Sequence, residues 1–202
     1  MINSQNTTEQ KILDAARKVF HQKGYDGARM QEIAEEAGIN KSLLHYYFRS
    51  KDNLFDAVFT EAMNGLLSRI TGIITSEKSL EDKIRYIFND YISFLQKNSY
   101  VPWFIINAVN HCPEKVTSVL HENNIDPDKI FKYLRDSASA EEYGKPDFRQ
   151  LYVNIIALCA FPVVAKPILK DLLGLTEEGY QQFLEERKTI LPDFFMNAIR
   201  KK

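Results

Sequence analysis

The sequence predicts an all-α protein, and three observations lead to that prediction. All seven prolines of the 202-residue chain lie after residue 101, and glycines number only eight. Residues that break helices are therefore sparse over long stretches. Apolar residues recur at the intervals of an amphipathic helix, whereas strict alternation is rare. With 45% hydrophobic and 26% charged residues, the chain can also bury a sizeable core.

The N-terminal segment is expected to form three helices. Thr7 and Gln10 have the spacing of a capping box at the start of the first helix, and Gly24 can end it. Two shorter helices are expected over residues 31–37 and 41–48.

The rest of the chain is expected to be helical as well. The expected helices cover residues 54–74, a segment starting near Ser79, and residues 103–110, 114–122, 127–140, 148–169 and 177–199, with a loop at 139–147. Pro162 and Pro167 should kink or end the helix over 148–169, and Pro192 should kink or split the last one.

The overall charge excludes little, but its distribution is uneven. The net charge is −1, which by itself indicates neither nucleic acid nor an anionic membrane as a partner. Residues 1–51 hold eight Lys and Arg against six Asp and Glu, a balance of +2, while residues 52–202 hold eighteen against twenty-one, a balance of −3. A mildly basic head on an acidic body is indicated.

Two cysteines, Cys112 and Cys159, provide neither a disulfide framework nor metal-ligand spacing. Each is expected to be a buried small side chain. The N-terminus lacks the apolar segment of a signal peptide, and the apolar stretch over residues 155–165 is too short to span a bilayer. We therefore expect a cytoplasmic protein with no membrane partner and no metal.

Residues 30–51 contain two short helices around the turn EEAGINK. Gly38 can adopt the left-handed conformation that such a turn requires. The residues spaced to pack both helices against the first one are Ile33, Ala34, Ala37, Ile39, Leu44 and Phe48. This arrangement is helix–turn–helix geometry.

The second of these helices is expected to present a positive face. Asn40 is a good N-cap, and the amides that follow it favour a phosphate group. The solvent side would show Lys41, Ser42, His45 and Tyr47, with Arg49 and Lys51 at the C-terminal end. No acidic residue lies between Gly38 and Lys51.

Residues 11–59 resemble the DNA-binding domain of the TetR family of transcriptional regulators. The family pattern combines F-x-x-x-G-[YF] at the end of the first helix, IA-x-x-AG-[VI] at the turn, and L-Y-x-x-F-x-[SN]-K at the recognition helix. The corresponding segments here are FHQKGY at 20–25, IAEEAGI at 33–39 and LHYYFRSK at 44–51. The resemblance implies an N-terminal three-helix domain with a helix–turn–helix, joined to a larger helical ligand-binding and dimerisation domain.

Two positions depart from the family pattern. His45 replaces a Tyr that packs on the DNA backbone, and a histidine contact becomes pH-sensitive because the imidazole titrates near neutrality. Ala28 and Arg29 stand where the family often has Ser or Thr before the second helix. Arg29 could replace that phosphate contact by its charge.

The resemblance implies DNA contacts from eight residues: Arg29, Asn40, Lys41, Ser42, His45, Tyr46, Tyr47 and Lys51. Lys51 is expected to hold a phosphate, and Tyr47 to reach a base edge in the major groove. The alternative for Lys41, Tyr47 and Lys51 is an ordinary solvated helix face. For Tyr46, packing within the protein and contact with DNA are equally expected.

Large aromatic side chains are frequent over residues 85–155, the region that forms a ligand pocket in the family. Such residues are most often core, but aromatic cavities with a few polar groups also hold small apolar ligands. The candidate ligand-binding residues are Phe88, Tyr91, Trp103, Phe104, Asn107, His111, Phe131 and Tyr152.

The last two long helices carry apolar stripes that suggest an interface. The candidate residues are Leu151, Ile155, Leu158, Phe161, Phe183, Leu184, Leu191 and Phe194. The family pairs these helices with their symmetry mates in a four-helix bundle. A two-fold dimer also places two recognition helices on two half-sites.

These features predict a homodimeric transcriptional regulator with a DNA-binding domain over residues 1–51 and a ligand-binding and dimerisation domain over residues 52–202. A repressor is expected, released from a palindromic double-stranded operator by a small apolar or amphipathic ligand. The alternative is a ligand-binding or protein-interaction module whose helix–turn–helix no longer binds DNA. The sequence contains no glycine-rich phosphate loop, HExxH or GxSxG motif, so neither an enzyme nor a cofactor is expected.

Overall fold

The computed structural model describes residues 2–103, 105–106, 113–123, 125–138, 143 and 147–201. The helices are α1 (Ile2–Gly27), α2 (Met30–Glu36), α3 (Lys41–Tyr47), α4 (Lys51–Ile74), α5 (Leu80–Lys97), α7 (Pro113–Glu122), α8 (Pro127–Asp136), α9 (Phe148–Val164), α10 (Lys166–Leu172) and α11 (Glu177–Ile199). Among the described residues, the extended pairing is limited to one isolated bridge, between Tyr143 and Arg200. The all-α prediction is confirmed.

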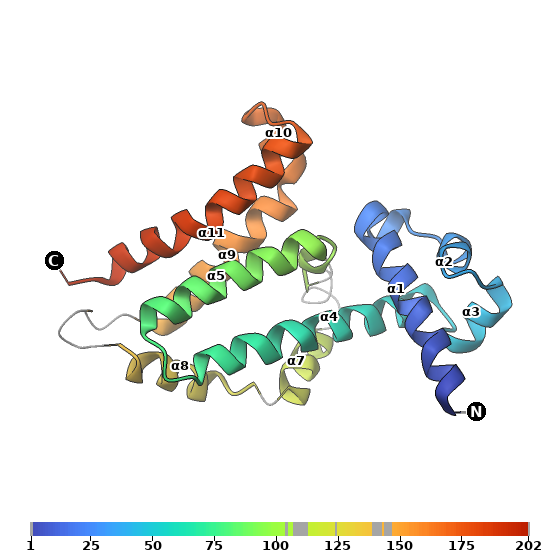
Figure 1. Ribbon diagram of the computed structural model, residues 1–202, viewed down its shortest axis with the longest axis horizontal. Helices are drawn as coiled ribbons and strands as arrows, with labels where there is room; N and C mark the ends of the chain where they lie inside the picture. Colours follow the sequence, from blue (N-terminus) through green and yellow to red (C-terminus); the bar gives the residue numbers. More distant parts are fainter. Residues whose placement is uncertain are drawn as a thin grey trace.

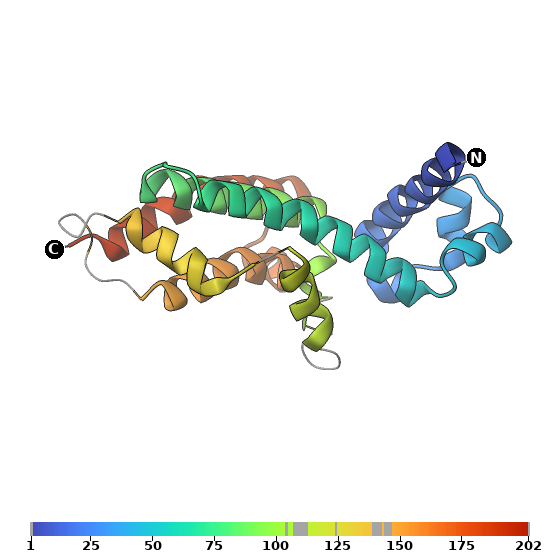
Figure 2. The same ribbon diagram turned by 90° about the horizontal axis from the view of Figure 1, so that it is seen from below.

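The molecule is elongated, with a small head at one end and a longer helical body (Figure 1). Helices α1, α2 and α3 form the head together with the first turns of α4. The rest of α4 runs on into the body beside α5 (Figure 2). A single continuous helix therefore connects the head to the body.

The head has a compact core of its own. Ile33, Ala34 and Leu44 have no exposed surface, and the ring of Phe20 on α1 meets that of Phe55 on α4 edge-on, with 4.7 Å between centroids. Helix α1 packs on α2 and α4, and α2 packs on α3. These contacts hold the two short helices, which would be too short to persist in isolation.

Two glycines make the sharp changes of direction in the head. Gly24 and Gly38 both have a φ of 66°, the left-handed region in which a side chain is strained. Gly24 breaks α1 near its C-terminal end, and Gly38 turns the chain between α2 and α3. Both roles are as the sequence predicts.

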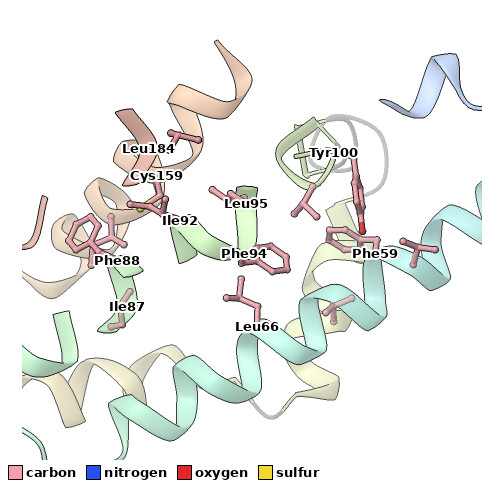
Figure 3. Close-up of a cluster of buried hydrophobic side chains, with 14 of the residues drawn as sticks. Phe59, Leu66, Ile87, Phe88, Ile92, Phe94, Leu95, Tyr100, Cys159 and Leu184 are labelled. Carbon is pink, nitrogen blue, oxygen red and sulfur yellow. The ribbon is translucent and has the colours of Figure 1, made fainter. Parts of the chain in front are cut away.

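Helix α5 is the centre of the body and packs against α4, α9 and α11. Figure 3 shows Phe94 of α5 beside Leu66 of α4, and Ile92 beside Cys159 of α9. Cys159 is buried, as expected, and burial raises the pKa of its thiol to about 12.

The predicted N-cap at Asn40 and the predicted helix start near Ser79 are confirmed, because each of these side chains accepts a hydrogen bond from a backbone amide three residues on. The predicted start of the first helix is wrong. Helix α1 begins at Ile2, and Thr7 lies within it. None of residues 2–6 is Gly or Pro, so nothing in this segment interrupts the helix.

The last part of the chain departs from the expected helix boundaries. The helix over 148–169 is interrupted, as its two prolines predict, and the break lies between them at Ala165, where α10 leaves α9 at 74°. Pro162 and Pro192 lie inside α9 and α11 without ending either helix. Pro167 stands at the start of α10, where a backbone N–H would have no acceptor within the helix, so the proline costs no hydrogen bond.

Side chains of α11 explain why α9 tolerates its proline. Pro162 has no N–H, so the carbonyl oxygen of Leu158 loses its usual helical donor. The Arg187 Nη2 atom donates to that oxygen at 2.8 Å. At the end of α9, the Tyr180 hydroxyl donates to the Pro162 carbonyl oxygen at 2.9 Å. Both orphaned carbonyls are thus satisfied from α11.

Parts of two further expectations fall outside the described residues: most of the helix over 103–110 and most of the loop over 139–147. In the described part of the chain, no single helix has the length and hydropathy to cross a membrane, although the bent pair α9 and α10 passes that test when taken together.

Candidate nucleic-acid interface

The recognition helix α3 is fixed at both ends and on one side. The Asn40 Oδ1 atom accepts from the Leu43 amide at 2.8 Å, and the Phe48 amide donates to the Leu44 carbonyl at 2.8 Å. The buried side chains of Leu44 and Phe48 anchor the helix to the head core. Asn40 therefore acts as the cap that the sequence predicts.

The outward face of α3 carries Lys41, Ser42, His45 and Tyr46, all of which are exposed. Tyr46 is 72% exposed, more than the other large apolar or aromatic side chains of the described head. Its ring meets that of Tyr47 edge-on, with 5.5 Å between centroids. This face is free to meet a partner, with an aromatic ring near its middle.

Tyr47 does not lie on the solvent side where the sequence analysis placed it. Its side chain is partly buried against the head core. Tyr47 follows the buried Leu44 by three residues, and residues three apart share a helix side. That spacing was available in the sequence and could have distinguished Tyr47 from Tyr46.

His45 is exposed, and its Nδ1 atom lies 3.3 Å from the carbonyl oxygen of Arg49. The contact holds the imidazole against the end of α3 and uses only one of the two ring nitrogens. The other nitrogen can bond to an external partner.

Among the described residues, carboxylates neutralise three of the four cations of α1, with Lys11 as the exception, but none of three further cations in the head. The ion pairs join Lys18 to Glu36 and Lys23 to Glu32, each at 3.0 Å, and Arg17 to Asp14 and Glu61. Arg29, Lys41 and Arg49 are exposed and have no ion pair with any described residue. Unpaired positive charge thus lies on α3 at Lys41, directly after it at Arg49, and before α2 at Arg29.

Arg29 immediately precedes α2, where its side chain makes no capping hydrogen bond. Ala28 beside it is buried. The hydroxyl cap that the family often has at this point is therefore missing, and Arg29 projects a charge instead.

Lys51 is bound within the protein and is not a free end of the recognition helix. It is the first residue of α4. Its Nζ atom donates to the carbonyl oxygens of Tyr25 at 2.9 Å and of Ala28 at 3.3 Å, and lies 4.2 Å from the centroid of the Tyr25 ring. Two of its three donors are used. One donor remains for the phosphate contact that the sequence predicts, so that contact stays a prediction.

Tyr25 completes this connection between the end of α1 and the start of α4. Its hydroxyl donates to the carboxylate of Asp52. Burial, reinforced by this hydrogen bond, raises the pKa of Tyr25 to about 12. Backbone carbonyl acceptors leave no trace in a sequence, so the role of Lys51 could not have been found there.

The candidate ligand-binding residues of the body do not share one environment. Phe88 is fully buried on α5, with its ring 5.6 Å from that of Phe195 on α11. Phe88 is therefore ordinary core, whereas Trp103 is 54% exposed.

Three other candidates lie closer together: Tyr91 on α5, Phe131 on α8 and Tyr152 on α9. The rings of Phe131 and Tyr152 meet edge-on at 6.1 Å. Tyr91 is partly buried, and burial raises the pKa of its hydroxyl, with a smaller effect from Cys159 and Tyr152. Phe104, Asn107 and His111 lie outside the described residues.

The candidate dimer residues separate into two groups. Ile155, Leu184 and Leu191 are buried within the subunit, so their side chains are not available at its surface. Leu151, Leu158 and Phe183 are partly buried. Phe161 and Phe194 are each 62% exposed.

The head is a helix–turn–helix with unpaired cations on and near its two short helices, and it is joined to an all-helical body. These features define a helix–turn–helix transcriptional regulator. Residues 12–58 match the model of the family described as "Bacterial regulatory proteins, tetR family". Residues 12–58 therefore form the domain that this family model describes.

Similar proteins extend the likeness beyond this domain. The probable HTH-type transcriptional regulator YttP of Bacillus subtilis is 21% identical, covering 94% of each chain. The IcaR negative transcriptional regulator of the biofilm operon icaADBC, from Staphylococcus epidermidis, is 22% identical over 91% of this chain and 97% of its own. The structure of FadR from Bacillus subtilis in complex with stearoyl-CoA superposes with a TM-score of 0.64 at 18% identity, over 94% of this chain and 98% of FadR. At that identity the likeness shows the fold alone.

Proposed function

We propose that the protein is a homodimeric repressor that binds a palindromic double-stranded operator through α3 and releases it when a small apolar or amphipathic ligand binds the body. The observation that carries the proposal is the distribution of charge in the head. Arg29, Lys41 and Arg49 are exposed and unpaired, while three of the four cations of α1 are neutralised. Unpaired cations on an exposed helix attract phosphates and release counterions.

The exposed residues of α3 divide by chemistry. Lys41 on α3, Arg49 after it and Arg29 before α2 are cations that can bind phosphates. Phosphate contacts position a protein on DNA. Ser42, His45 and Tyr46 occupy the outward face and can contact base edges in the major groove. The greater exposure of Tyr46 favours it over Tyr47 as the aromatic contact.

The dimer is supported by the surface of α9 and α11. Phe161, Ile190 and Phe194 are large, apolar and exposed there. A group of such side chains on one face marks an interaction surface. A two-fold axis through this surface would present two copies of α3 to two half-sites about one helical turn apart, roughly 34–36 Å.

The division into a DNA-binding domain over 1–51 and a ligand-binding and dimerisation domain over 52–202 belongs to the same proposal. Phe55 of α4 packs on Phe20 of α1, so the first turns of α4 complete the head core. Because α4 is continuous from Lys51 to Ile74, a ligand that shifts it in the body also shifts the head. Repression, as opposed to activation, is supported by the name of IcaR, a negative transcriptional regulator. An amphipathic ligand is supported by the complex of FadR with stearoyl-CoA.

Selection of bound sequences from random duplex DNA tests the DNA-binding part. The wild-type protein should enrich a palindrome. Replacing Arg29, Lys41 and Arg49 together by Ala should abolish the enrichment, whereas replacing the exposed body lysines Lys78, Lys97 and Lys132 by Ala should leave it intact. Wild-type protein that enriches no sequence would instead support the module that no longer binds DNA.

The fluorescence of Trp103, the only tryptophan, tests the ligand part. Stearoyl-CoA and stearate are titrated against the protein with and without the selected duplex, and Trp103→Phe gives the background signal. Linkage requires the duplex to weaken ligand binding by the same factor by which ligand weakens duplex binding. Equal ligand affinity in the two titrations contradicts the proposed regulation by these compounds.

A further inference from the structure

The segment that follows α5 returns from the body to the head. Asn98 caps α5, and its Nδ2 atom donates to the Phe94 carbonyl at 2.9 Å. The Tyr100 hydroxyl donates to the Asn98 Oδ1 atom at 3.2 Å, and the Val101 amide donates to the Asn98 carbonyl at 3.0 Å. Only 8% of Asn98 and 3% of Tyr100 is exposed. The segment is therefore a buried, internally bonded turn.

The ring of Tyr100 is part of the aromatic core of the head. Its centroid lies 6.3 Å from that of Phe20 on α1 and 5.7 Å from that of Phe55 on α4. Figure 3 shows Tyr100 directly beside Phe59, one turn further along α4. A side chain supplied by the body thus lies where α1 and α4 meet.

Polar contacts surround this aromatic junction. The His21 Nδ1 atom of α1 lies 3.2 Å from the Ser99 Oγ atom, the residue before Tyr100. Arg17 of α1 pairs with Glu61 of α4 at 2.9 Å. Helix α1 is consequently held both to α4 and to the segment over residues 98–101.

From this geometry we propose that Tyr100 is a positioning residue for DNA binding, which fixes the angle of the head on the body. Without its ring, α4 and the contact between His21 and Ser99 would set that angle, and a helix with fewer supporting contacts bends more easily. In a dimer, the angle of each head sets the distance between the two copies of α3. That distance has to match the spacing of the half-sites. The inference rests on the proposed function, because it concerns the same DNA-binding face.

Half-site spacing tests the inference. Duplexes carry two copies of the selected half-site, with the spacer lengthened or shortened by one or two base pairs. Wild-type protein should prefer one spacing. Tyr100→Ala and Tyr100→Leu should each reduce the affinity ratio between the best spacing and its neighbours by about fivefold or more, the lower end of ordinary coupling between sites. Tyr100→Phe, which keeps the ring, should retain the wild-type ratio.

The controls separate positioning from folding. Tyr86→Ala removes an exposed tyrosine of α5 and should change neither affinity nor ratio. Circular dichroism establishes that each variant is folded, and Tyr100→Leu keeps much of the apolar bulk if Tyr100→Ala is unstable. An unchanged ratio in a folded Tyr100→Leu protein overturns the inference, as does an equal loss of affinity at every spacing. Absence of duplex binding by the wild type would overturn the proposed function instead.

Discussion

The head and the body leave opposite kinds of side chain at the surface. In the head, Ile33 and Leu44 are fully buried, and the outward face of α3 is polar and positive apart from Tyr46 and the marginally exposed Leu43. In the body, Phe161, Phe194 and Leu172 lie exposed on α9, α11 and α10. The head therefore buries its large apolar side chains, with Tyr100 of the body as part of its core, whereas the body presents apolar surface of the kind that a second molecule covers. We therefore expect the head to attract its partner by charge, and the body to bind its partner by burying apolar surface.

The largest expected effect is loss of the dimer on placing a charge in the apolar surface of the body. In Phe194→Asp, the carboxylate would be buried without a partner when two copies associate. An unpaired buried charge costs about 3 kcal/mol or more, which raises the dimer dissociation constant by more than about a hundredfold. Light scattering across a concentration series measures the change.

Thr189→Asp provides the matched control on the same helix. Thr189 is exposed and lies five residues before Phe194, about 140° around α11. The control should remain dimeric. A wild-type protein that is monomeric at micromolar concentration would contradict the comparison between the two ends of the molecule.

The second expected effect concerns stability and tests the contacts that join α1 to α4 in the head. In Lys51→Ala, the carbonyl oxygens of Tyr25 and Ala28 lose the ammonium that joins α1 to α4. A hydrogen bond to a charged group contributes about 1.5–3 kcal/mol, so loss of the shorter bond alone should lower the free energy of unfolding by about 2 kcal/mol, and loss of the longer bond adds to this. Urea denaturation followed by circular dichroism checks this value.

Lys51→Met separates the ammonium from the alkyl chain of the lysine. The methionine can still pack on the Tyr25 ring but cannot donate, so most of the loss should remain. If both variants unfold at the wild-type urea concentration, the internal role assigned to Lys51 is wrong.

The third expected effect is smaller and appears only in DNA binding. Lys41 is exposed and unpaired, so Lys41→Ala should leave the urea midpoint unchanged. Loss of one phosphate contact should weaken all duplexes alike and lower the salt slope of log affinity by about one unit. Fluorescence anisotropy at several salt concentrations measures the slope, with Lys78→Ala as the control. An unaltered slope would remove Lys41 from the interface.

The head could be predicted well because its features are local. Gly24 and Gly38 take the left-handed conformation that their places in the pattern require, and Asn40 caps α3 as its position implies. The features of the head that the sequence does not reveal depend on contacts across the chain. Lys51 bonds to backbone groups 26 and 23 residues away, and the aromatic role of Tyr100 at the head has no sequence pattern.

The body could be predicted only as a set of helices. Helix α9 is apolar on most sides, so residue spacing identifies the helix without telling which side faces the core. Ile155 lies inside and Phe161 outside, although both fit one apolar stripe. The interruption between Pro162 and Pro167 could be predicted from those prolines, but the bond from the Tyr180 hydroxyl to the Pro162 carbonyl oxygen, which joins α11 to the end of α9, could not.

The smallest expected effect lies where the two regions meet and concerns pH. Desolvation where α1 meets the body lowers the pKa of His21, and the positive charge of Lys166 lowers it further. The folded protein therefore favours the neutral imidazole, while the unfolded chain keeps the ordinary pKa of about 6.5. Above that pH His21 contributes no pH dependence. As the pH falls through about 6.5 and then through the lower pKa of the folded state, the unfolded chain binds the proton more readily, and stability declines.

His21→Gln should abolish this contribution, because glutamine does not titrate and can still bond to Ser99. Between pH 8 and pH 5 the urea midpoint of the wild type should therefore fall slightly more than that of the variant. His121→Gln, at an exposed position on α7, serves as the control and should follow the wild type. A variant that loses as much stability as the wild type over this range would show that burial between α1 and the body does not lower the pKa of His21.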